Sequence, residues 1–163
     1  MIMSMIFDPR VVPSKSNLSI LDVGNYLGEI DEVKLLDPFA NGDQNYQITC
    51  IADGGTARYI NTFTQYDKDD QPTQKMLQGW SVLTKICESV GIHIAEGEPL
   101  PDLTVALPTM PIAFQVGYKV KKDPEDNWVY DEGERKDGST YRKTIIIAFA
   151  RSMAGLPAPR KEL

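Results

Sequence analysis

Aromatic and basic side chains gather between Ile112 and Phe149, in a chain that is acidic elsewhere. Two strand-like runs lie within this stretch, Phe114–Lys122 and Tyr141–Phe149. Lysine and arginine can neutralise phosphate groups, and flat rings can stack on unpaired bases. A β-hairpin that carries both kinds of side chain is therefore typical of a surface that binds nucleic acid.

The candidate site combines cations for phosphates with rings for bases. The cations are Lys119, Lys121, Lys122, Arg142 and Lys143, and the rings are Tyr59, Phe63, Trp128 and Tyr141. Tyr59 and Phe63 share one face of a strand, where they either stack on bases or fill the interior of a barrel. Trp128 belongs to the acidic insert 123–139, whose carboxylates repel phosphates. A solvated hairpin with one aromatic anchor is an equal alternative for this insert.

Few residues are suited to catalysis or to metal binding. His93 is the single histidine, and the two cysteines do not cluster, so a zinc site would need mostly carboxylates. The acidic group Asp67, Asp69 and Asp70 lacks the glycine and the terminal glutamate of a calcium-binding EF-hand loop. A solvated loop with a helix cap explains this group better. The sequence predicts a protein that is not an enzyme and has no metal or cofactor.

Composition indicates one globular domain. The chain has 163 residues, of which 42% are hydrophobic. It has no stretch of about 20 apolar residues and no signal-like start, so we expect a cytoplasmic protein with no membrane partner. Cys50 and Cys87 lie in apolar patterns and are expected to be reduced core residues, a disulfide between them being the minor alternative.

Charge is distributed unevenly along the chain. The formal net charge is −6, made up of −8 in residues 1–110 and +2 in residues 111–163. A strongly acidic total argues against binding to duplex DNA, for which a basic domain is usual. Any binding to nucleic acid must therefore depend on a local groove.

Hydrophobic periodicity predicts a mainly β fold with one helix. Three strands are expected within 24–66, with a tight turn at Asp53-Gly54-Gly55 between the second and the third. A helix is expected between Pro72 and Gly91, followed by the two C-terminal strands. This order favours an OB-fold-like, five-stranded Greek-key barrel with the helix between strands 3 and 4. We expect an N-terminal arm over 1–19, one domain over 20–152 and a flexible tail over 153–163.

Several segments resemble the phage-encoded single-stranded-DNA-binding proteins of the OB-fold type. The similar segments are Val23–Ile30, Gly79–Leu83, Val90–Ile92, Val116–Val120 and Tyr141–Ile145. The resemblance implies single-stranded DNA binding in phage replication or recombination, in the cytoplasm of the host cell, with replication or recombination proteins as partners. Many members end in an acidic tail, whereas this sequence ends Pro159-Arg160-Lys161-Glu162-Leu163. Recruitment of partners through a tail is therefore not supported.

Two other classes of function stay open at this stage. A phage structural or protein-interaction module would explain the acidic N-terminal two-thirds and the proline-rich segment that precedes the last two strands. A metal-dependent nuclease would use the acidic group at 67–70. An exposed strand edge in an open barrel would also permit a homodimer.

Overall fold

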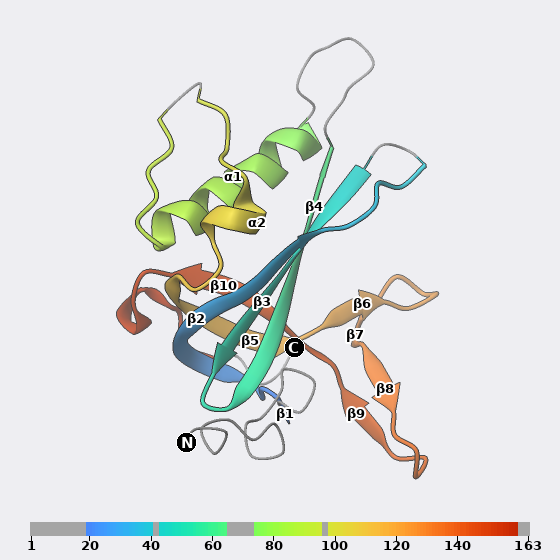
Figure 1. Cartoon of the computed structure of the whole chain (residues 1–163). Helices are drawn as coiled ribbons and strands as arrows, with labels where there is room; N and C mark the ends of the chain where they lie inside the picture. The colour runs from blue at the N-terminus through green and yellow to red at the C-terminus, as the bar shows by residue number, and fades with distance from the viewer. Residues whose placement is uncertain (1–18, 41–42, 65–73, 96–97, 160–163) are drawn as a thin grey trace, which may run out of the picture.

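The structure is a computed structural model, which describes residues 19–40, 43–64, 74–95 and 98–159. The described chain is mainly β, with one main helix and a curled sheet of six strands (Figure 1). This confirms the predicted mainly β class with a single long helix. The sheet has one strand more than predicted because Ser19–Ile20 (β1) pairs in parallel with the start of Gly55–Thr64 (β4).

The other five strands of the curled sheet pair with one another in antiparallel fashion. The order across the sheet is β1-β4-β3-β2-β5-β10. The bounds are Gly24–Leu35 (β2), Asp43–Ala52 (β3), Gly55–Thr64 (β4), Pro111–Tyr118 (β5) and Thr144–Ala150 (β10). Curling brings β10 back toward β4, where the rings of Tyr59 and Phe149 meet edge to face with centroids 5.3 Å apart.

The long strand β2 makes the curling possible. Its first half pairs with β5 and its second half with β3, with a register shift between Ile30 and Glu32. Such a bulge bends a strand and increases its twist. At Gly28 a Cβ atom would lie 2.0 Å from the carbonyl oxygen of Ile51, so only glycine lets the two backbones approach this closely.

The predicted tight turn between β3 and β4 is confirmed. Asp53 and Gly54 both have positive φ, 50° and 76°. Two consecutive residues of this kind form the turn whose twist matches that of a β-hairpin. The turn fixes the register of β3 and β4, which pair over the whole of both strands.

The predicted helix is also confirmed, as α1 over Gln74–Ser89. Its buried face carries Leu83, Ile86 and Cys87, and it contacts both β4 and β10. The helix therefore spans the two strands that the curl brings together. Gly91, with φ of 89°, follows its C-terminus. The short helix α2 (Leu103–Ala106) packs against β2 at the same end of the molecule (Figure 1).

Both cysteines are free and buried, as predicted. Burial raises the pKa of the Cys50 thiol to about 12, and the charge of Asp31 adds to this shift. Burial also raises the pKa of Cys87. Both raised pKa values mean that the two buried thiols are neutral near pH 7.

The first part of the predicted C-terminal tail is held against the sheet. A short 3₁₀ turn over Met153–Gly155 (η3) follows β10. The carbonyl oxygen of Pro157 then accepts hydrogen bonds from Gln115 Nε2 at 2.7 Å and from Asn25 Nδ2 at 3.0 Å. Gln115 is buried, and its Nε2 also donates to Asn25 Oδ1 at 2.9 Å, so the carbonyl of Pro157 completes the hydrogen bonding of this amide group.

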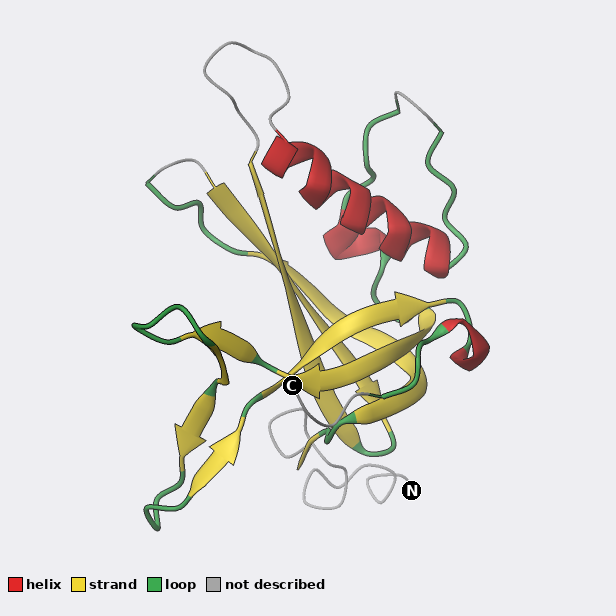
Figure 2. Ribbon diagram, turned by 180° about the vertical axis from the view of Figure 1, so that it is seen from behind, coloured by secondary structure: helices red, strands yellow, loops and turns green. Residues whose placement is uncertain are grey.

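The insert between β5 and β10 differs from the single hairpin tip expected at 123–139. It forms two hairpins, and Figure 2 shows them projecting from the sheet at the end away from the helices. The first arm consists of Val120–Lys122 (β6) and Trp128–Tyr130 (β7), and the second of Glu132–Glu134 (β8) and Thr140–Arg142 (β9).

Each arm reverses at a turn organised by an aspartate. The carboxylate of Asp123 accepts hydrogen bonds from the backbone N–H groups of Glu125 and Asn127. The carboxylate of Asp137 accepts from the N–H and the hydroxyl of Ser139, and these bonds lower the pKa of Asp137. Two local turns thus divide a segment that we expected to be one loop.

Candidate nucleic-acid interface

The two arms leave the sheet at a three-way junction of backbone hydrogen bonds. The N–H of Lys119 donates to the carbonyl of Lys143 at 2.8 Å, and that of Lys143 donates to Asp131 at 2.9 Å. The N–H of Asp131 closes the ring by donating to Lys119 at 2.8 Å. Three residues that are far apart in sequence are therefore fixed side by side by the backbone.

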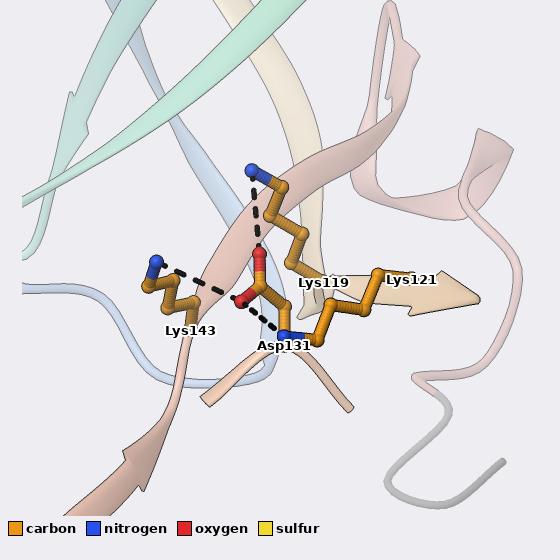
Figure 3. A network of polar contacts seen from close by, with 4 residues as sticks. All are labelled: Lys119, Lys121, Asp131 and Lys143. Atoms are coloured by element: carbon orange, nitrogen blue, oxygen red, sulfur yellow. Dashed lines mark ion pairs between the residues drawn. The ribbon is translucent and has the colours of Figure 1, made fainter. Parts of the chain in front are cut away.

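The side chains at this junction form a cluster of three lysines around one carboxylate (Figure 3). The ammonium groups of Lys119, Lys121 and Lys143 lie 3.6, 3.9 and 3.7 Å from the carboxylate oxygens of Asp131. The Asp131 side chain is 14% exposed, whereas the three lysines are about half exposed. The cluster carries a net positive charge and presents it to solvent.

A groove runs from this cluster along the outer face of β1 and β4. It has two connected parts, of about 720 and 330 Å³, which share Ile20, Tyr141, Lys143 and Thr144. One wall comes from β9 and the start of β10, and the other from β1 and β4. The hydroxyl of Thr144 donates to the carbonyl of Leu21 at 3.2 Å and so ties the two walls together.

The lining of the groove is basic. Its cations are Arg58, Lys119, Arg135, Arg142 and Lys143. Among the described lining residues Asp22 is the one carboxylate. Like charges that share one concave surface concentrate the local field, which attracts anions even to a protein that is acidic as a whole.

Apolar side chains and rings accompany these cations. Ile20 and Ile60 are exposed on the strand wall, and Ile145 lines the same part of the groove. Tyr141 is 41% exposed and lines both parts. Its ring lies across Gly133 of β8, where a Cβ atom would come within 2.6 Å of the ring. The guanidinium of Arg135 lies 5.1 Å from the ring centroid.

Arg142 is positioned by two further rings at the base of the arms. Its guanidinium lies 3.9 Å from the ring centroid of Tyr130 and 5.3 Å from that of Tyr118. The two rings meet edge to face, with centroids 5.5 Å apart. Such cation–π contacts hold an arginine without neutralising its charge.

The structure thus brings together four of the residues predicted for the site, and Lys121 joins them through Asp131. Lys119, Tyr141, Arg142 and Lys143 line the groove. Lys122 and Trp128 form a separate pair on the first arm, with the ammonium group 5.1 Å from the ring centroid. Lys122 also pairs with Asp126 at 3.0 Å. Trp128 is 60% exposed, and neither residue of the pair is among the described lining of the groove.

Of the two rings predicted on the third strand, that of Tyr59 is not among the described lining of the groove. Tyr59 is half-buried and packs against the core, and its ring makes an edge-to-face contact with the ring of Phe149. The barrel-filling alternative describes Tyr59 better than the stacking one. The side chain of Phe63 lies outside the described residues.

Sequence reasoning did not select Arg58 or Arg135. Arg58 and Ile60 lie on the face of β4 opposite Tyr59, and both are exposed. The alternation of side chains along this strand already placed Arg58 and Ile60 on the face opposite the rings. An exposed isoleucine next to an arginine on that face indicates a surface that could bind a ligand. The sequence alone could not place Arg135 in the groove, because Arg135 belongs to the second arm and its position depends on how that arm folds.

The described part of the chain holds no group of three histidine, cysteine, aspartate or glutamate side chains that could bind a metal ion. The predicted acidic group Asp67, Asp69 and Asp70 lies outside the described residues. None of the described helices is long and apolar enough to cross a membrane.

A scan against models of protein families and a search of curated proteins gave no match to this chain. The function is therefore inferred from the geometry and the charge of the groove.

Proposed function

We propose that this chain is a non-enzymatic single-stranded-DNA-binding protein with an OB-like barrel. The groove between β9 and the outer face of β1 and β4 is its binding surface. One observation carries the proposal: five cations, an exposed tyrosine and exposed isoleucines share one groove. Cations that follow a backbone and apolar or aromatic surfaces for unpaired bases are the two requirements of single-strand binding.

The arrangement of the strands supports the OB-like assignment. Without β1, the order is β4-β3-β2-β5-β10, and α1 lies between β4 and β5 in sequence. Curling places β4 beside β10, with α1 across both strands. In OB-folds the strand faces and the adjoining loops bind oligonucleotides. The two arms extend the connection between the last two strands of this order.

The groove favours a single strand over a duplex for a physical reason. Bases in a duplex are stacked on one another, and their faces are not available to Tyr141, Ile20 or Ile60. A single strand offers both its phosphates and its base faces. The acidic remainder of the protein also opposes wide, nonspecific contact with a duplex.

The biological setting that we propose is phage DNA replication or recombination in the cytoplasm of the host cell. Replication or recombination proteins would be its partners, and a homodimer is compatible with this setting. These proposals depend on the resemblance of segments such as Val23–Ile30 to phage single-stranded-DNA-binding proteins.

A phage structural or protein-interaction module is the second candidate. One observation favours it: the first arm presents Trp128, 60% exposed, beside the acidic turn that contains Asp123 and Asp126. An exposed tryptophan at the end of a projecting hairpin can anchor a protein partner. Such a module would associate with itself or with a partner and would not bind oligonucleotides.

The proposed function is tested by fluorescence anisotropy with a labelled thymidine oligonucleotide of about 30 nucleotides, at low and at moderate salt. We expect binding to the single strand that weakens with salt and that duplex DNA competes for poorly. Binding should be detectable at low salt, where the attraction between the cations and the phosphates is strongest. Lack of binding at low salt would reject the proposal and favour the interaction module.

A further inference from the structure

Asp131 occupies an unusual position for an anion in a phosphate-binding surface. Its carboxylate is shared by the ammonium groups of Lys119, Lys121 and Lys143, at 3.6 to 3.9 Å (Figure 3). Lys119 and Lys143 also line the groove. The carboxylate therefore lies beside the cations that a phosphate of the bound strand would contact.

We infer that Asp131 is a built-in counter-ion that limits how tightly the groove holds a polyanion. This inference rests on the proposed function and adds a specific residue that tunes it. A phosphate that enters the groove must share the ammonium groups with the carboxylate, so the cluster offers less attraction than three free lysines would. Weaker attraction favours release of the strand, which a protein that is displaced during replication or recombination requires.

Asp131 has a second effect, which acts in the opposite direction, because the carboxylate also gathers the lysines. This positioning effect is the smaller one. The lysine side chains are about half exposed, and ion pairs of that kind contribute little to structure. The ring of backbone hydrogen bonds fixes Lys119, Asp131 and Lys143 without the carboxylate. Removal of the charge should therefore strengthen binding.

The size of the effect follows from Coulomb's law. A unit charge some 4 to 8 Å from a phosphate, in surroundings close to water, changes the affinity by about 2- to 6-fold. The variant Asp131→Asn keeps the shape of the side chain and removes its charge. We expect it to bind the thymidine oligonucleotide about 2- to 6-fold more tightly than the unaltered protein. We also expect a steeper salt dependence, by about 0.7 in the slope of log K against log salt.

The matched control is Asp126→Asn, on the tip of the first arm. Asp126 also pairs with a lysine, Lys122 at 3.0 Å, and its side chain is 79% exposed. The control makes the same change in net charge away from the groove, so it should strengthen binding much less. An equal gain in the two variants would mean that net charge alone matters, and it would overturn the inference.

A second readout, elution from a heparin column, separates this inference from the proposed function. Heparin is a polyanion without bases. Later elution of Asp131→Asn than of Asp126→Asn, with no binding of either protein to the oligonucleotide, would uphold the counter-ion and reject DNA binding. Unchanged or earlier elution of Asp131→Asn, with its amide NMR spectrum preserved, would overturn the counter-ion whatever the oligonucleotide does.

The asparagine could loosen the junction, and the NMR spectrum would report this as lost amide signals of the arms. Asp131→Ser, which keeps a small polar side chain, then replaces it in both measurements. If both variants lose the arm signals, Asp131 is a structural residue of the junction and the inference is wrong.

Discussion

Simultaneous replacement of Lys119 and Lys143 by glutamine is expected to weaken binding to a single strand about 30-fold at low salt. Both lysines line the groove, and both lie at the junction of the arms. Each lost lysine–phosphate contact should cost about 1 kcal/mol of binding free energy, and every 1.4 kcal/mol changes the affinity about tenfold. Two fewer cations should also flatten the slope of log K against log salt by about 1.4. Anisotropy titrations over a range of salt concentrations measure both quantities.

The matched control is the pair Lys34→Gln and Lys85→Gln. Lys34 lies on β2, where it pairs with Glu32 at 3.3 Å, and Lys85 is exposed on α1. The control makes the same change in net charge outside the described lining of the groove. It should leave affinity and salt slope nearly unchanged. Equal losses in the two double variants would remove the groove from the binding surface.

The second large effect concerns stability. Phe114→Ala should lower the free energy of unfolding by about 3–5 kcal/mol, out of a typical total of about 5–15 kcal/mol. Phe114 is fully buried in β5, and its ring stacks on that of Tyr26 with centroids 5.7 Å apart. It pairs with Tyr26 of β2 and with Phe149 of β10. Its loss leaves a cavity where three strands meet. Urea unfolding followed by circular dichroism measures the change.

Phe39→Ala provides the control for this stability measurement. Phe39 is 56% exposed, so the same truncation removes little buried surface. We expect a change within about 0.5 kcal/mol. A loss of less than 1 kcal/mol for Phe114→Ala would contradict the position of Phe114 at the centre of the core.

Elements with a strong local signal could be predicted from the sequence. The Asp53-Gly54 turn requires positive φ at two residues, and few other sequences satisfy that requirement. The helical pattern predicted α1, and its members Leu83, Ile86 and Cys87 are buried. Trp80 and Leu77, which the same pattern assigned to that face, are exposed. The free, buried state of both cysteines followed from the apolar patterns around them.

Features that depend on contacts distant in sequence could not be predicted. The two-armed insert arises from local turns at Asp123 and Asp137, but the ring of bonds among Lys119, Asp131 and Lys143 joins separate strands. For the same reason the sequence could not show that Asp131 contacts three lysines. The strand alternation shows that Arg58 faces outward, but the groove that it lines depends on curling of the sheet, which no local pattern specifies.

Photo-crosslinking tests the central claim, that the groove holds the strand, most directly. A thymidine oligonucleotide that carries 4-thiothymidine would be irradiated with the protein, and the crosslinked peptides identified by mass spectrometry. We predict crosslinks at Tyr141 and at the outer face of β4 around Arg58 and Ile60. Crosslinks confined to Trp128 or to the exposed face of α1, in protein that binds the oligonucleotide, would contradict the account.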